Sequence, residues 1–222
     1  MENNLNNISL LPIFYGIKKE DLLSMFKCLG AYSKIYSKNE LIYIENQKIR
    51  YIGIILSGKV HMIKEDINGN KSIVLCLEEG EIFGETFACG NDLSSSVTFI
   101  ANKKCNIIFI PFHKVINTCK MTCTFHHRLI ENMVNLISRK NILLMNKIDA
   151  VSKKNLRDKI LTYLYSQSEL FKNNEFTIPL GRVELADYLC TDRSALTREL
   201  NNMKEEGIID FHKNFFKIFY TK

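Results

Sequence analysis

The sequence predicts an α+β fold in three parts: an N-terminal antiparallel β-roll, one long helix, and a C-terminal helix–turn–helix followed by a β-hairpin. Three observations lead to this prediction. Residues 31–111 contain short apolar or alternating runs separated by turn residues, which is typical of an antiparallel barrel or roll. Residues 124–148 contain no Gly or Pro, and their apolar positions recur at helical spacing. Two short helical patterns and two short strands follow.

The length and composition are those of a globular protein of two domains with a connecting helix. The chain has 222 residues, of which 46% are hydrophobic and 24% charged. We place the boundaries at 1–111, 112–149 and 150–222. No apolar run approaches the roughly 18 residues of a membrane span, and the first residues lack the features of a signal peptide. We therefore expect a cytoplasmic protein that does not associate with membranes.

The β-roll is predicted from seven strand-sized runs and one hairpin signal. Asn68-Gly69 joins two of these runs, and Asn-Gly is the strongest short hairpin signal. Gly58, Gly80 and Gly84 indicate further turns. A small helix, KKEDLLSMFKCL, precedes the strands. The expected strands are AYSKIYSK, ELIYIE, YIGIIL, KVHMIKE, KSIVLCL, SVTFIA and CNIIFI.

The long helix carries two apolar faces. One is a seam whose members are spaced by alternating steps of four and three residues, as in a coiled coil with one polar member. The other lies beside it and is suited to cover the chain's own roll. This pattern predicts a homodimer, and the alternative is a helix buried within a monomer. The seam is Ile130, Val134, Ile137, Asn141, Leu144 and Ile148, and the second face is Leu129, Met133, Leu136 and Leu143.

The C-terminal pattern is a winged helix–turn–helix. The segment LRDKILTYLYSQSEL predicts a helix, FTIPL a strand, RVELADYLC and DRSALTRELNNMKEEG the two helices, and IIDFHKNFFKIFY the wing. We expect Ala186, Leu189, Leu196 and Leu200 to hold the two helices together, with Thr191 or Asp192 as the N-cap of the second helix.

The second of these helices has a polar face that packing does not require. Arg193, Ser194, Thr197 and Arg198 project from its first turns, the part that enters a DNA major groove. The arginine fork can bond guanine O6 and N7 together, or hold a phosphate. The alternative interpretation is an ordinary solvated helix face.

In this order of parts the chain resembles the Crp/Fnr family of transcription regulators. The resemblance rests on IILSGKVHMI (54–63), GEIFGE (80–85) and RVELADYLCTDRSALTRELNNMKEEGII (182–209). It implies a cyclic-nucleotide-binding-type β-roll, a dimerisation helix, and DNA-binding domains that reorient when the roll senses a signal. The implied partners are double-stranded DNA, a second copy of the chain and RNA polymerase. Arg182, which begins the last segment, joins the expected DNA-binding residues.

The residues that read DNA depart from the family pattern at one position. The family often has a glutamate after the first arginine of the reading helix, where it accepts from cytosine, but this chain has Ser194. A hydroxyl can donate or accept, so it discriminates less between bases; we expect a palindromic operator, and Ser194 does not predict whether it has the family's usual TGA half-site. The stretch DRSALTREL (192–200) also resembles clostridial members, including the HcpR-like branch linked to nitrosative stress.

The residues of the predicted sensor pocket differ from the family pattern more than the DNA-reading residues do. Cyclic-nucleotide members line their pocket with a Gly-Glu pair and a later Arg-Ser pair whose arginine neutralises the phosphate. Gly84 and Glu85 match the first pair, but Ser95 stands ten residues beyond Glu85, followed by Ser96, and no arginine occurs between Arg50 and Arg128. A buried phosphate without a charged partner is too costly, so we do not expect cyclic AMP to bind. Glu85 is then either a turn residue or a ligand contact.

The long helix also supplies candidates for relaying the signal. Lys140 and Asn141 fall where this helix would face the pocket. Asn141 has an alternative role, since a polar residue in a seam fixes its register.

Cofactor binding is weakly supported. A four-cysteine iron–sulfur set before the roll is not expected, because only Cys28 precedes it. Cys119, Cys123 and His126 or His127 have helical spacing that could hold a metal, although such spacing on one helix is usually incidental. If the roll binds haem, the candidate ligands are His61, Met62, His113 and Met145.

These patterns favour a dimeric, signal-gated DNA-binding regulator. Its sensor responds either to a small organic effector or, through haem or redox chemistry, to a signal such as nitric oxide. An alternative of another class is a cyclic-nucleotide-type module that regulates a protein partner. No catalytic motif is present, so we do not expect an enzyme.

Overall fold

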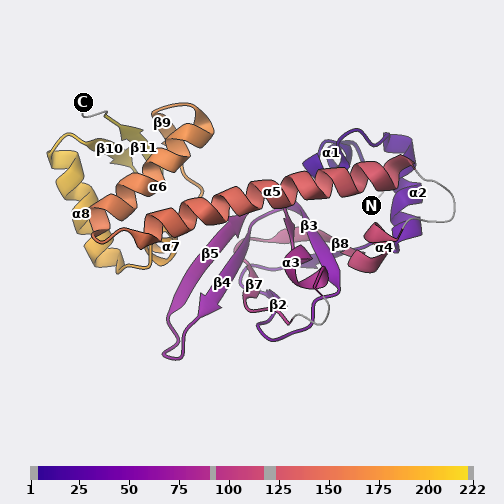
Figure 1. Ribbon diagram of the computed structural model, residues 1–222. Coiled ribbons are helices and arrows are strands. Elements are labelled where there is room, and N and C mark those ends of the chain that lie inside the picture. Colours follow the sequence, from indigo (N-terminus) through magenta and orange to yellow (C-terminus); the bar gives the residue numbers. More distant parts are fainter. Residues whose placement is uncertain (1–4, 91–93, 118–123, 220–222) are drawn as a thin grey trace. The chain divides into compact units, whose positions relative to one another are not determined.

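The computed structural model describes residues 5–90, 94–117 and 124–219, which form two compact units. Residues 1–64 and 77–140 belong to the first unit, and residues 65–76 and 141–222 to the second. Figure 1 shows the elements in chain order. No helix in the described ranges is long and apolar enough to cross a membrane.

The predicted β-roll is confirmed as two four-stranded antiparallel sheets. Their strand orders are β1-β8-β3-β6 and β2-β7-β4-β5. All seven predicted runs form strands, and β6 is an additional short strand that the sequence pattern did not reveal. The strands are β1 (Tyr32–Tyr36), β2 (Leu41–Tyr43), β3 (Tyr51–Ser57), β4 (Val60–Glu65), β5 (Lys71–Leu77), β6 (Ile82–Phe83), β7 (Thr98–Ala101) and β8 (Cys105–Pro111).

The Asn68-Gly69 hairpin between β4 and β5 forms as expected. Gly69 has φ +81°, in the left-handed region that glycine adopts without strain. The Asp66 carboxylate accepts from the N–H groups of Asn68, at 2.8 Å, and Asn70, at 2.9 Å, so it satisfies the backbone of the turn. The Asn70 side-chain amide also donates to the Asp66 carboxylate, at 2.9 Å, and this bond, followed by the backbone bonds, holds the pKa of Asp66 below its usual value.

Short helical segments precede, interrupt and follow the strands of the roll in the chain. They are α1 (Leu5–Ser9), a 3-10 turn (Pro12–Phe14), α2 (Lys19–Leu29), α3 (Glu85–Ala88) and α4 (Phe112–Ile116). The predicted helix before the roll corresponds to α2. It ends at Gly30, whose left-handed conformation (φ +66°) lets its N–H reach back to the last turn.

The long helix is α5 (Thr124–Ser152), which confirms the prediction and extends it by four residues. Three members of its predicted second apolar face cover the roll, as expected, whereas the fourth, Leu143, is only partly buried. Leu129, Met133 and Leu136 are buried in one cluster with residues of α2 and with Ile54 and Ile108 of the strands. This half of α5 is therefore fixed to the roll by apolar burial.

The second unit contains the predicted winged helix–turn–helix. Helix α6 (Leu156–Phe171) is capped by Asn155, whose side-chain oxygen accepts from the N–H of Asp158. A three-stranded sheet of order β10-β11-β9 follows. The remaining elements are β9 (Glu175–Thr177), α7 (Arg182–Tyr188), α8 (Arg193–Glu205), β10 (Ile209–His212) and β11 (Phe215–Ile218).

Candidate DNA-binding surface and sensor site

The turn between α7 and α8 is closed by apolar packing and by backbone hydrogen bonds. The expected stripe is confirmed, since Leu189, Leu196 and Leu200 have no exposed surface and Ala186 only 2%. Cys190 has φ +51°, and the N–H of Thr191 donates to the carbonyl of Ala186 at 3.1 Å, as in a Schellman helix end. This geometry fixes the angle at which α8 leaves the turn.

The outward face of α8 carries the predicted polar residues. Arg193, Ser194, Thr197 and Arg198 are all exposed. The Thr197 hydroxyl donates to the carbonyl of Arg193 at 2.8 Å, so towards an external partner it offers a lone pair and a methyl group. Asp192 occupies the N-cap position, but its side chain accepts no capping hydrogen bond. The first backbone N–H groups of α8 therefore lack a side-chain cap.

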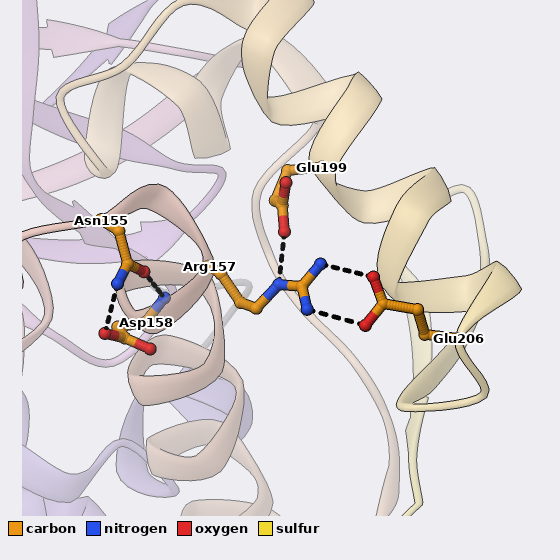
Figure 2. Close-up of polar contacts among 5 residues, drawn as sticks. All are labelled: Asn155, Arg157, Asp158, Glu199 and Glu206. Atoms are coloured by element: carbon orange, nitrogen blue, oxygen red, sulfur yellow. Dashed lines mark hydrogen bonds and ion pairs between the residues drawn. The ribbon is translucent and has the colours of Figure 1, made fainter.

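A guanidinium from α6 fixes the other side of α8. The Arg157 Nε lies 2.6 Å from the Glu199 carboxylate, and its two terminal nitrogens each lie 2.7 Å from an oxygen of Glu206 (Figure 2). Such a two-point contact restrains both position and rotation. These bonds raise the pKa of Arg157 and lower that of Glu206. Arg157 thus orients the helix whose opposite face is exposed.

Arg182 connects α7 to the wing. Its guanidinium carbon lies 4.8 Å from the centre of the Phe211 ring, and one nitrogen donates to the carbonyl of Lys213 at 3.4 Å. Burial, followed by the nearby charge of Arg193, lowers the pKa of Arg182. Arg182 thus supports the wing and also adds positive charge beside α8. Lys213 is exposed at the tip of the wing, where φ is +55°.

Lys147, near the C-terminal end of α5, is held by carbonyl groups. Its ammonium donates to the carbonyl of Ile73 and, at 2.6 Å, to that of Tyr188, the last residue of α7. It also lies 4.0 Å from the centre of the Tyr188 ring. A cation at a helix C-terminus complements the helix dipole. Burial nevertheless lowers the pKa of Lys147 to about 8.

Aromatic side chains fill the interior of the roll. Phe83 and Phe99 have ring centres 5.2 Å apart, and Tyr43 and Phe109 are separated by 5.9 Å. All four side chains are buried. Gly53 makes this packing possible, because a Cβ there would lie 2.2 Å from the Phe83 ring. The interior is therefore packed at the start of the Gly84-Glu85 segment.

Glu85 and Lys140, which the sequence named separately, form a buried ion pair. The Lys140 ammonium lies 2.6 Å from Oε1 of Glu85 and 2.6 Å from the carbonyl of Ile82. The Glu85 side chain is only 3% exposed and the Lys140 side chain only 11%. The second carboxylate oxygen of Glu85 is buried and has no hydrogen-bond partner among the described residues. This pair connects α5 to the first residue of α3.

Two family descriptions match separate parts of the chain. Residues 33–121 match the cyclic nucleotide-binding domain, and residues 158–219 match the Crp-like helix-turn-helix domain. The chain belongs to the Crp/Fnr family of transcription regulators.

Individual relatives of this Crp/Fnr-family regulator are distant. The cyclic AMP receptor protein of Thermus thermophilus is 21% identical over 204 residues, or 89% of this chain and 88% of that protein. The structure of CLP, the c-di-GMP-responsive global regulator of Xanthomonas campestris, has a TM-score of 0.70 at 15% identity and covers 90% of this chain and 100% of CLP. FixK2 of Bradyrhizobium japonicum has a TM-score of 0.63 at 16% identity, covering 86% of this chain and 93% of FixK2. Both structures share the fold.

Within the described residues of this Crp/Fnr-family regulator, the two serines predicted to line the pocket form no hydrogen bond with Glu85. Ser95 is 1% exposed, and its hydroxyl donates to the carbonyl of Val97 at 2.6 Å. Its backbone groups pair with Gln47 and Asn46, so local structure uses all its polar groups. Ser96 is exposed.

The predicted seam residues of this regulator differ in exposure. Val134 is 53% exposed and Ile148 65%, and Asn141 is also exposed. Ile130 and Ile137 are partly buried against the core. Leu144 is partly buried. Part of the seam is therefore available to a second chain, and part contacts the roll.

The possible metal and haem ligands are distributed over several elements, and two of them lie outside the described residues. Cys119 and Cys123 lie outside the described residues, and His126 is buried on α5. Of the haem candidates, His61 and Met62 lie on β4, whereas His113 is exposed on α4 and Met145 is exposed on α5. Within the described ranges, no group of three or more His, Cys, Asp or Glu residues could hold a metal ion.

Sequence reasoning missed three residues of the unit that carries the candidate DNA-binding surface. Arg157 and Lys147 lie on amphipathic helices, where a basic residue gives no signal of a distant partner. Lys213 had a detectable signal, because the His-Lys-Asn turn between two short strands marks the tip of the wing.

Proposed function

We propose that this protein is a homodimeric, signal-gated transcription regulator that binds a palindromic operator through α8 and does not respond to cyclic AMP. The observation that carries the DNA-binding assignment is the exposed Arg193, Ser194, Thr197 and Arg198 face, on a helix whose buried side is packed and whose orientation Arg157 fixes. Arg193 reads a base edge, and Arg198 contacts a base or a nearby phosphate. Ser194 and Thr197 supply secondary contacts.

The dimer follows from the exposed apolar residues of α5. Val134, Met145 and Ile148 are each more than half exposed, and at helical spacing they share one side of α5 with Asn141. Such a stripe is stable in water when a second helix covers it. Two copies of α8 related by a twofold axis meet successive major grooves about 34 Å apart, so the operator is an inverted repeat spaced by one helical turn. At the bound operator the dimer acts on RNA polymerase, as the family resemblance implies.

Two features oppose a cyclic nucleotide. Ser95, where the resemblance places an arginine, has its hydroxyl bonded to Val97 and offers no charge to a phosphate. Glu85, where the resemblance places the ribose contact, is paired with Lys140. We infer instead that this ion pair holds α5 to α3, and that the signal alters the contact between Glu85 and Lys140. Asn141, the next residue on α5, fixes the register of the seam.

Alanine variants of Arg193 and Arg198 test the assignment. The operator is first identified by selecting bound fragments from genomic DNA. Replacing a base-contacting arginine lowers operator affinity by about 1–3 kcal/mol and relaxes selectivity at one base pair. Replacing a phosphate-contacting arginine weakens all sequences alike and reduces the salt slope by about one.

Binding is measured on operator and scrambled DNA at two salt concentrations. Lys172→Ala, at the exposed C-terminal end of α6, serves as the matched control and leaves affinity unchanged. If neither arginine variant alters operator affinity, α8 does not read DNA and the proposal fails. Calorimetric titration with cyclic AMP gives no saturable heat, and micromolar binding would contradict the argument from Ser95.

A further inference from the structure

A cavity outside the predicted sensor pocket is lined by cationic and aromatic side chains. It has a volume of about 200 Å³ and lies between the segment that precedes β3, the end of α3 and the start of α4. Lys48, Arg50 and His113 line it, and among the described residues no acidic side chain lines it. The apolar part of the lining is Ile49, Phe87, Ala88, Gly90 and Phe112.

The cationic side chains that line this cavity favour an anionic ligand. Arg50 and His113 have no ion-pair partner within the described residues. The guanidinium of Arg50 presents a planar fork of donors, and the His113 imidazole has an N–H donor in either protonation state. Like charges around one cavity repel each other, and a bound carboxylate or phosphate relieves that repulsion while accepting charge-assisted hydrogen bonds.

The remaining walls define the body of the ligand. Phe87 is buried at 8% exposure and Phe112 is partly buried, so an apolar group bound there covers aromatic surface that already belongs to the wall of the cavity. A cavity of about 200 Å³ has room for a compact ring with one anionic substituent.

We propose that this cavity binds a small organic anion, with its carboxylate or phosphate group held by Arg50, His113 and Lys48 and its apolar, ring-sized body against Phe87 and Phe112. A second consequence rests on the proposed function. One wall of the cavity is the end of α3, whose first residue is Glu85, the partner of Lys140 on α5. A ligand in the cavity therefore contacts α3, the same short helix whose Glu85 forms the ion pair with Lys140.

Binding is measured by calorimetry and NMR on the full chain without DNA, so that the site is tested separately from the proposed function. The probes are phenyl phosphate and phenylacetate, with inorganic phosphate and benzyl alcohol as controls that lack the ring or the charge. At least one aryl anion binds saturably at millimolar concentration or below, and both controls bind more weakly. The stronger aryl anion identifies phosphate or carboxylate as the preferred group.

Three variants locate the binding. Arg50→Ala weakens the aryl anion by about tenfold, the loss expected for one charge-assisted hydrogen bond. Ala88→Leu blocks the cavity without removing a charge and weakens it similarly. Lys114→Ala removes an exposed cation beside His113 that does not line the cavity, and it leaves binding unchanged.

Three results would overturn the site: no saturable binding of either aryl anion, binding unaffected by both Arg50→Ala and Ala88→Leu, or equal binding of benzyl alcohol. Circular dichroism of each variant verifies that the fold is retained. Operator affinity is then measured with and without the bound anion. An unchanged affinity would refute the coupling through α3, whereas a failure to bind any operator would count against the proposed function alone.

Discussion

Replacing Lys140 by Met tests whether the buried ion pair holds α5 to the roll. The substitution replaces the unbranched alkyl chain of Lys by one that ends at the equivalent of Cε and so removes the ammonium, which lies 2.6 Å from both the Glu85 carboxylate and the carbonyl of Ile82. The Glu85 side chain is 3% exposed, so water cannot replace the lost partner. The only other side-chain hydrogen bond to this carboxylate among the described residues comes from the Thr86 hydroxyl, at 3.2 Å.

The expected loss follows from this geometry. Removing one partner of a buried pair leaves an uncompensated charge and costs about 3–5 kcal/mol. That is a large part of the roughly 5–15 kcal/mol that stabilises an ordinary domain. The double variant Glu85→Leu/Lys140→Met removes both charges and fills the space with apolar groups, so it recovers most of the loss.

The free energy of unfolding is measured by urea titration at one fixed protein concentration, because dimerisation makes stability depend on concentration. Circular dichroism and tyrosine fluorescence are suitable signals, since the chain has no Trp. Lys153→Met is the control. It breaks an exposed pair with Asp149, and the expected change is within about 1 kcal/mol. The reasoning is wrong if Lys140→Met is as stable as the control, or if the double variant is no more stable than Lys140→Met.

Three further outcomes follow from the structure. Val134→Asp places a carboxylate at a position that is 53% exposed in the single chain but buried in the proposed dimer seam. We therefore expect monomers in sedimentation and an unchanged circular dichroism spectrum. A persistent dimer would exclude the α5 interface. Arg157→Lys retains the charge but loses the two-point contact with Glu206, so we expect weaker operator binding although every residue of α8 is intact, and wild-type affinity would show that this contact does not orient α8. Because burial lowers the pKa of Lys147 from 10.5 to about 8, the unfolded chain binds more protons between these values, and this lysine makes the folded state more stable as pH rises through that window. An NMR titration of the Lys147 side chain should have its midpoint near pH 8, and a midpoint equal to that of exposed lysines would contradict the effect of burial.

The sequence by itself determined the order of the elements and the faces of the helices. These features follow from local patterns, because backbone sterics and side-chain periodicity act over a few residues. The patterns are the alternation of apolar and polar residues in the strands, the Asn68-Gly69 turn, and the absence of Gly and Pro from residues 124–148. The same reasoning placed Leu189, Leu196 and Leu200 inside the helix–turn–helix and Arg193 outside it. The two-residue strand β6 and the four-residue helix α3 are too short to show a period, and the sequence did not reveal them.

Only the tertiary structure decided which charged groups meet. Glu85 and Lys140 are 55 residues apart in the chain, and Arg157 and Glu206 are 49 apart. The residues next to a lysine on a helix do not predict its partner, because the partner depends on how that helix packs against a distant segment. The cavity lined by Arg50, Phe87 and His113 arises in the same way, since three separated segments must fold together before its cationic and aromatic walls face a common space.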